Sequence, residues 1–313
     1  MEFLRLLEGI RSPGVSAFMS SITFFGDETV FMALAVTLFW CVSKRQGLYV
    51  YAVGLGGTVL SQWLKLIFRI PRPWVLDPNF TIVEAAREGA GGYSFPSGHT
   101  QGVVGSFGSL ALSNKQVWLR VVCCVLILLV PFSRMYLGVH TPLDVGVAFA
   151  CAVALVLAFF PCFRDDARMK KCTLPVYLGL FLFTLCFAIW VNTASFPADV
   201  DVENLTHGSK NSWSLLGAVL GMIVSYIYDD RKLHFDVKAP FLGQVCKVVL
   251  GLALVMGLRM GLKPLLTALA GDAHWTNAVR YCVMVLFAGC VWPMTFPYFA
   301  KLGAKKDKTE PVK

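Results

Sequence analysis

Long uninterrupted apolar stretches constrain this chain more than any other feature of its sequence. A helix needs about 20 mostly apolar residues to cross a bilayer, and nine stretches reach or approach that length: residues 27–43, 47–69, 98–113, 118–133, 141–161, 174–193, 211–229, 242–263 and 278–300. Helices and closed barrels are the only structures that satisfy the backbone within lipid. The sequence therefore predicts an all-α, polytopic membrane bundle of about nine transmembrane helices.

The composition also favours a membrane protein. Apolar residues make up 56% of the chain and charged residues 15%, whereas soluble domains average roughly 45–50% and about 25%. The net charge of +9 lies largely in short loops and in the C-terminal tail. Membrane topology explains such a distribution better than nucleic-acid binding does, so we expect membrane lipids and no nucleic acid as partners.

Four segments are predicted along the chain. Residues 1–26 lack a signal-peptide core and are expected to form an amphipathic helix at the membrane interface, although a re-entrant piece is an open alternative. Residues 27–163 hold all the candidate catalytic residues. Residues 164–300 supply further helices of unknown role, and residues 301–313 form a basic cytoplasmic tail. Nothing in the sequence specifies an oligomeric state.

Lysine and arginine are concentrated in the loops at one end of the predicted bundle: Lys44, Arg45, Lys115, Arg120, Arg164, Arg168, Lys170, Lys171, Arg231, Lys232 and Lys238. The positive-inside rule assigns these loops to the cytoplasm. Nine spans then place the N-terminus outside and the C-terminus inside. We expect an integral protein of the bacterial plasma membrane with its active site at the outer face; an ER membrane protein with a lumenal site is the alternative.

Polar residues gather close to this outer face in three short clusters. Their members are Lys65, Arg72, Ser97, Gly98, His99, Arg134, His140 and Asp144. Polar and ionisable groups at membrane depth are energetically unfavourable, which makes them functional candidates. Taken singly, a cation near a span end usually reaches to the interface, and a Ser-Gly pair is usually a helix cap. Their convergence on one face favours a catalytic site.

The residue types in these clusters suit a phosphoryl group. Lys65, Arg72 and Arg134 are cations, and arginine can bind phosphate with two parallel hydrogen bonds. Ser97 and Gly98 open a helix, whose N-terminal N–H groups favour an anion. Glycine also lets the backbone approach a ligand closely. We therefore expect these five residues to bind phosphate.

His140 and His99 are the groups that can exchange a proton near neutral pH. His140 precedes Asp144 by four residues, and on a helix starting near Pro142 that spacing can bring the carboxylate to the imidazole. A carboxylate bonded to one ring nitrogen fixes the tautomer and leaves the other nitrogen free to attack. His140, His99 and Asp144 are thus the predicted catalytic residues.

The three clusters resemble the signatures of the type 2 phosphatidic acid phosphatase superfamily. The matching segments read KLIFRIPRP from Lys65, PSGH from Pro96 and SRMYLGVHTPLD from Ser133, and the similarity covers roughly residues 25–161. It implies a core resembling a six-helix bundle and a phosphatase that uses no metal or other cofactor. By the same resemblance, His140 attacks phosphorus, Asp144 orients it and His99 protonates the leaving oxygen.

A site at the membrane face suits a lipid whose headgroup lies in water and whose tail stays in the bilayer. The expected substrates are therefore lipid phosphates or diphosphates: phosphatidic acid, phosphatidylglycerol phosphate, a polyprenyl diphosphate or a sphingoid phosphate. A sugar-phosphate phosphatase and a phosphotransferase that uses the same site are the alternatives. A transporter or binding protein with a decayed site is disfavoured because the signature residues are intact.

Overall fold

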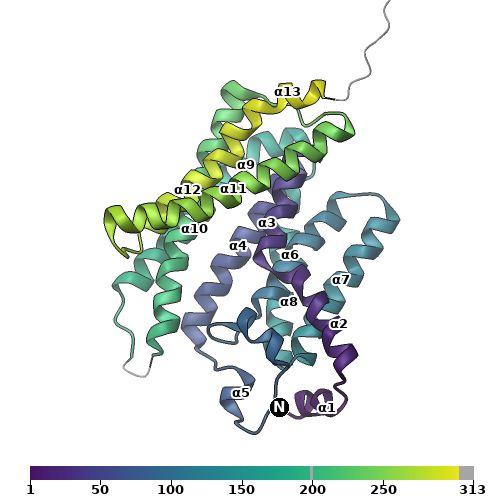
Figure 1. Cartoon of the computed structure of the whole chain (residues 1–313), viewed down its shortest axis with the longest axis vertical. Coiled ribbons are helices and arrows are strands. Elements are labelled where there is room, and N and C mark those ends of the chain that lie inside the picture. Colours follow the sequence, from purple (N-terminus) through teal and green to yellow (C-terminus); the bar gives the residue numbers. More distant parts are fainter. Residues whose placement is uncertain (198–199, 303–313) are drawn as a thin grey trace, which may run out of the picture.

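The computed structural model describes residues 1–197 and 200–302. Helices run the length of this described part, which contains no strand (Figure 1). The N-terminal helix α1 (Glu2–Gly9) lies at one end of the molecule, and the last helix, α13 (Phe296–Lys301), lies at the other. The all-α architecture predicted from the sequence is confirmed.

Seven helical segments are long and apolar enough to span a membrane. They are built on α4 (Lys44–Phe68), α7 (Val117–Tyr136), α8 (Pro142–Phe159), α9 (Asp166–Thr193), α10 (Val202–Tyr228), α11 (Phe241–Ala270) and α12 (Thr276–Leu286). An eighth candidate is the pair α2 (Pro13–Thr23) and α3 (Glu28–Thr37), which meets the criterion jointly with a bend of 50°. All nine predicted segments are helical, and nine is an approximate count of spans.

The ninth predicted span corresponds to α6 (Gly98–Ser113), which has only 16 residues. At about 1.5 Å per residue such a helix is shorter than the hydrocarbon core. Short elements complete the described part of the chain: α5 (Pro73–Leu76), η1 (Phe24–Gly26), η2 (Leu38–Val42), η3 (Glu84–Ala86), η4 (Glu88–Ala90), η5 (Phe160–Phe163), η6 (Asp229–Leu233), η7 (Phe287–Val291) and η8 (Trp292–Thr295).

The first 26 residues divide into two helices with different surroundings. On α1, Leu4 and Leu7 are buried against the protein, while Leu6 and Ile10 are exposed. An exposed apolar side is what the predicted interfacial helix requires. Helix α2 instead continues into α3 as a broken span or a re-entrant loop, the alternative that the sequence left open.

Helix α4 forms the centre of the bundle and packs against α3, α6, α8, α9 and α10. Glycines permit the close approach: a Cβ on Gly54 would lie 2.1 Å from the Phe31 ring on α3, and one on Gly57 would lie 2.5 Å from the Gln101 side chain on α6. Tyr177 on α9 donates a hydrogen bond of 2.9 Å to the Leu48 carbonyl. The helices after residue 164 are thus tied directly to the predicted catalytic core.

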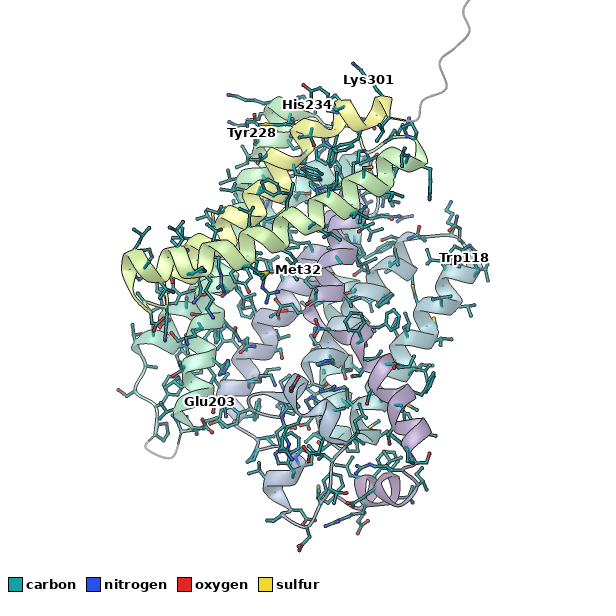
Figure 2. The ribbon with its side chains drawn as sticks, in the orientation of Figure 1. Met32, Trp118, Glu203, Tyr228, His234 and Lys301 are labelled. Carbon is teal, nitrogen blue, oxygen red and sulfur yellow. The ribbon has the colours of Figure 1, made fainter. Side chains whose placement is uncertain are left out.

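The two ends of the molecule differ in the residues that they carry. Lys44 forms an ion pair of 2.6 Å with Asp229. Asp229 follows Tyr228 in the chain, and Figure 2 shows Tyr228 and Lys301 at the α13 end. Glu203 lies toward the opposite end, where α1 and α5 are found (Figures 1 and 2). The basic loops assigned to the cytoplasm therefore belong to the α13 end, and the predicted site belongs to the other.

Candidate active site

Four helix ends and one long connection build the site at the α1 end of the bundle. Helix α4 carries Lys65 in its last turn and ends at Arg69, a C-cap residue in the left-handed conformation with φ 50°. The connection from there to Ser97 brings Arg72 back over the helix ends. Ser97 caps α6, whose first residues are Gly98 and His99. Helix α7 supplies Arg134, and the start of α8 supplies Asp144.

The local sequence determines how α8 presents its carboxylate. Thr141 and Asp144 form a capping box: the Asp144 amide donates to Thr141 Oγ1 at 3.2 Å, and the Thr141 amide donates to Asp144 Oδ2 at 2.7 Å. Pro142 at the first helical position is preorganised for this start. The Ser97 amide also donates to the Asp144 carbonyl at 3.1 Å, which joins the second signature segment to the third.

His140 and Asp144 meet as the spacing of four residues predicted. Nδ1 of His140 lies 3.6 Å from Asp144 Oδ2, and both side chains are almost fully buried. This distance is longer than an ordinary hydrogen bond. Catalytic contacts in a free enzyme are often long and tighten in the substrate complex.

Arg72 defines the other side of the His140 ring. Its Nη1 lies 2.9 Å from His140 Nε2. The same Nη1 lies 3.4 Å from Nδ1, so the guanidinium lies against the imidazole ring, close to both of its nitrogens. The Asp144 carboxylate is on the Nδ1 side. A carboxylate on that side favours a proton on Nδ1, and in this tautomer Nε2 has the free electron pair that a nucleophile needs.

Backbone carbonyls hold the Arg72 guanidinium in place. Nε donates to the Gly92 carbonyl at 2.9 Å, Nη2 to Gly91 at 2.8 Å and Nη1 to Val139 at 3.0 Å. Arg72 is buried, with 6% of its surface exposed. A buried cation with several fixed acceptors is already oriented before an anion arrives, so little rearrangement accompanies binding.

Ser94 is a site residue that the sequence analysis missed. It is fully buried, and its hydroxyl donates to Asp144 Oδ2 at 2.6 Å. The Ser94 hydroxyl oxygen also lies 3.4 Å from His140 Nδ1. Its amide donates to the Ile70 carbonyl at 2.8 Å. The available signal was its place two residues before the Pro96-Ser97-Gly98-His99 segment. The neighbourhood was identified, but the partner of the hydroxyl was not.

Arg134 and Lys65 approach the site from two further helices. Arg134 is buried, and it donates to Thr23 Oγ1 at 2.9 Å and to the Gly89 carbonyl at 3.3 Å. Within the described residues its Nε has no hydrogen-bond partner. Lys65 donates to the Tyr93 carbonyl. Unpaired buried polar atoms are uncommon and suit a site that binds a charged ligand.

His99, Gly98 and Lys65 line a common cavity of 310 Å³ that extends from the site along α4. A Cβ on Gly89, the residue whose carbonyl accepts from Arg134, would lie 3.8 Å from the His99 ring. The eight predicted site residues are therefore brought together at one end of the bundle. The Ser97 hydroxyl accepts from the Thr100 amide at 3.4 Å and so acts as the cap of α6.

The electrostatics around His140 favour its neutral form. Burial lowers the pKa of the imidazole well below its usual range, and the nearby Arg72, Arg134 and Lys65 lower it further. The neutral imidazole is the form of histidine that can act as a nucleophile.

Two family profiles match most of the membrane part of the chain. The profile of the PAP2 superfamily matches residues 45–168, and that of the PAP2 superfamily phosphatase transmembrane extension matches residues 213–306. The putative undecaprenyl-diphosphatase YbjG of Escherichia coli (strain K12) is 30% identical over 139 residues, which cover 42% of this chain and 68% of that protein. The chain belongs to the PAP2 superfamily.

Other PAP2 relatives are similar over the same part of the chain. The undecaprenyl-diphosphatase BcrC of Bacillus subtilis (strain 168) is 29% identical over 45% of this chain and 74% of its own length. Phosphatidylglycerophosphatase B of the same organism is 25% identical over 52% of this chain and 80% of its own length. No solved structure matches the chain.

The superfamily match confirms the resemblance stated from the signature residues. The PAP2 profile covers residues 45–168, which hold all eight predicted site residues. Together with the transmembrane extension and the apolar helices, it makes this protein an integral membrane phosphatase.

Proposed function

We propose that this PAP2 phosphatase hydrolyses a lipid phosphate or diphosphate through a phosphohistidine formed on His140. The observation that carries the proposal is the pair of contacts on the His140 ring, with Arg72 at Nε2 and the Asp144 carboxylate on the Nδ1 side. This pair orients a neutral nucleophile toward a cation that can hold the phosphoryl group. A lipid substrate is favoured because the relatives are named for lipid phosphates and diphosphates.

The first step transfers the phosphoryl group to the enzyme. His140 Nε2 attacks phosphorus, a nitrogen–phosphorus bond forms, and the bond from phosphorus to the leaving oxygen breaks. His99 gives its proton to that oxygen, and Asp144 stabilises the positive charge that develops on the His140 ring. The products of this step are the lipid alcohol, or a lipid monophosphate when the substrate is a diphosphate, and phosphohistidine.

The second step returns the enzyme to its starting state. Water attacks phosphorus from the side that the leaving group has vacated, and His99 accepts a proton from it. The nitrogen–phosphorus bond breaks, and inorganic phosphate leaves. Lys65, Arg72 and Arg134 stabilise the charge on the phosphoryl oxygens in both steps, as do the backbone N–H groups at the start of α6 near Ser97 and Gly98. Removing one such group typically lowers the rate by about 100- to 1000-fold.

We further propose that the site faces the outside of a bacterial plasma membrane. The support is the distribution of charge: the basic loops lie at the α13 end, and the site lies at the other. A single cysteine placed at Glu84, an exposed residue beside the site, should react with an impermeant thiol reagent in intact cells. Labelling only after the cells are opened would indicate the opposite orientation, with the site on the cytoplasmic side.

Phosphate release from the purified protein tests the proposed function. We expect turnover of at least one lipid phosphate or diphosphate in a panel that also contains sugar phosphates, and we expect it to persist in excess chelator. Preferential hydrolysis of sugar phosphates would favour the sugar-phosphatase alternative, and stoichiometric transfer to an added alcohol without phosphate release would favour a phosphotransferase. Loss of all turnover in His140→Ala is the expected control.

A further inference from the structure

One face of α4 lines three successive cavities. Six of the α4 residues in these linings are Lys65, Gln62, Thr58, Leu55, Tyr51 and Leu48. Steps of three and four residues keep them on the same side of the helix. At about 1.5 Å per residue the series descends roughly 26 Å from the catalytic end, well beyond half of the roughly 30 Å hydrocarbon core.

The three cavities adjoin one another. The upper cavity, of 310 Å³, holds Lys65 and His99, and it shares Thr58 and Gln62 with a middle cavity of 80 Å³. The middle cavity shares Met32, Tyr51 and Tyr281 with a lower cavity of 60 Å³. Residues common to neighbouring linings make these spaces one interrupted track along α4.

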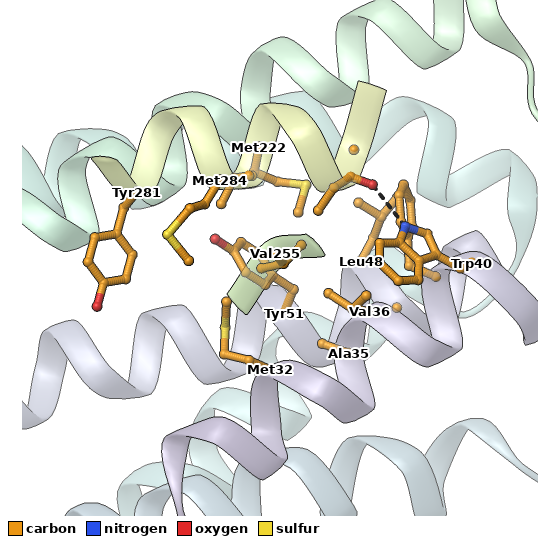
Figure 3. Close-up of a pocket in the computed structure, with 15 residues that line it drawn as sticks. Met32, Ala35, Val36, Trp40, Leu48, Tyr51, Met222, Val255, Tyr281 and Met284 are labelled. Atoms are coloured by element: carbon orange, nitrogen blue, oxygen red, sulfur yellow. Dashed lines mark hydrogen bonds between the residues drawn. The ribbon is translucent and has the colours of Figure 1, made fainter. Parts of the chain in front are cut away.

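Polarity changes along this track. Beside the upper and middle cavities, α4 presents the polar side chains of Thr58 and Gln62. The lower cavity is enclosed by aliphatic, aromatic and methionine side chains, and Figure 3 shows Met32, Met222 and Met284 around it. Polar groups thus lie near the phosphate site, and apolar groups lie deep in the membrane. A lipid phosphate has the same order, with a polar headgroup followed by an apolar hydrocarbon chain.

The helices after residue 200 form a wall of the lower cavity. Met222 comes from α10, Val255 from α11 and Met284 from α12, and they face Met32 on α3 (Figure 3). Trp40 closes one end by donating a hydrogen bond of 2.8 Å to the Ala288 carbonyl. The transmembrane extension therefore completes a space that the catalytic core alone does not enclose.

The catalytic geometry determines which part of the substrate occupies the upper cavity. The described lining of the upper cavity includes His99, the expected proton donor to the leaving oxygen, and does not include His140. In phosphoryl transfer the attacking and leaving atoms lie roughly in line on opposite sides of phosphorus. The leaving group, which carries the hydrocarbon chain of a lipid substrate, therefore points into the upper cavity.

We propose that the lower cavity binds the hydrocarbon chain of the substrate and that α10, α11 and α12 of the extension serve as its chain-binding wall. The inference rests on the proposed lipid phosphatase function. At 60 Å³ the cavity holds only a short part of a chain. Methionine side chains are flexible and adapt to irregular apolar ligands, and three of them border this space, so they can move aside as the chain enters.

A matched pair of tryptophan substitutions on α11 tests the chain site. Val255 lines the lower cavity, whereas the adjacent Leu254 is 48% exposed on the surface of the helical bundle. We expect Val255→Trp to lower kcat/KM for dioleoyl phosphatidic acid at least tenfold relative to dioctanoyl phosphatidic acid, and Leu254→Trp to leave that ratio unchanged. An unchanged ratio in both variants, or an equal loss on both substrates in Val255→Trp, would overturn the proposal.

Photolabelling tests the same site without turnover. Full-length His140→Ala protein is mixed with phosphatidic acid that carries a diazirine at the end of one chain. After illumination, we expect labelled peptides around Met222, Val255 and Met284, and fewer of them in Val255→Trp. Labelling confined to outward positions such as Leu254, or no labelling, contradicts the chain site. Absence of phosphate release from the whole panel would instead contradict the phosphatase function, so the two failures are distinguishable.

Discussion

Arg72 Nη1 lies 2.9 Å from His140 Nε2, and the same guanidinium is held by the carbonyls of Gly91, Gly92 and Val139. A fixed cation therefore faces the nitrogen that is expected to attack phosphorus. The same Nη1 lies 3.4 Å from Nδ1, so the guanidinium lies close to both nitrogens of the ring. This one relationship links phosphate binding to the nucleophile, and several predictions depend on it.

Replacing Arg72 by lysine should lower kcat/KM by about 100- to 1000-fold, the usual effect of removing one group that stabilises the transition state. Lysine keeps the charge but cannot reproduce the planar fork that three carbonyls hold. Steady-state phosphate release measures the change. Arg87→Gln is the control, because Arg87 is exposed and pairs with Glu84; it should change kcat/KM less than threefold. Near-normal activity in Arg72→Lys would exclude a specific role for the guanidinium.

Activity should persist into mildly acidic conditions. Burial and neighbouring cations lower the pKa of His140, so the neutral nucleophile predominates below the ordinary histidine pKa of about 6.5. The acid limb of kcat/KM, which reports the free enzyme, should therefore lie below that pH. Phosphorus NMR of the substrate micelles separates titration of the substrate from that of the enzyme. An acid limb of the enzyme at or above about pH 6.5 would contradict the neutral state assigned to His140.

Ser94 should act as a positioning residue for Asp144. Ser94→Ala removes a hydrogen bond of 2.6 Å, worth roughly 1.5–3 kcal/mol when the acceptor is charged. We expect kcat to fall about tenfold or more with little change in KM, and Asp144→Asn to lower kcat further. Rescue by Ser94→Thr would support the hydroxyl's role. A rise in KM with constant kcat would instead indicate a contact with bound substrate.

The proximity of His140 and Asp144 was predictable from sequence because its geometry is local. His140 and Asp144 are four residues apart at the start of a helix, and a capping residue followed by proline marks that start. Regular helix geometry then places the side chains. Ser94 was not predictable in the same way, because it lies in an irregular segment before α6 and contacts the same carboxylate across 50 residues of chain.

The span prediction succeeded where apolar length is decisive. The α4 and α7 segments meet the length criterion, whereas α6 is helical but short because Ser97 begins it within the active site. The wall around Met222, Val255 and Met284 could not be predicted, because apolar periodicity does not specify which helices will face each other. That information lies in tertiary contacts such as the one between Trp40 and Ala288.

Close packing of α4 against α3 should depend on Gly54. A Cβ at this position would lie 2.1 Å from the Phe31 ring, so Gly54→Ala must displace this ring from its place between α3 and α4. We expect a loss of about 1–3 kcal/mol of stability, typical of overpacking, seen as a lower melting temperature in detergent. Gly146→Ala on α8 is the control, because a Cβ there meets nothing within 4 Å. Equal stability of the two variants would contradict this account of the packing.

Covalent trapping of the intermediate tests the central claim most directly. The protein is mixed with the best substrate of the panel, quenched in base within one turnover to preserve phosphohistidine, and digested for mass spectrometry. We predict a phosphate on His140 Nε2, formed before inorganic phosphate appears and absent in His140→Ala. A phosphate on another residue, or rapid turnover with no phosphorylated protein at any time, would contradict the mechanism.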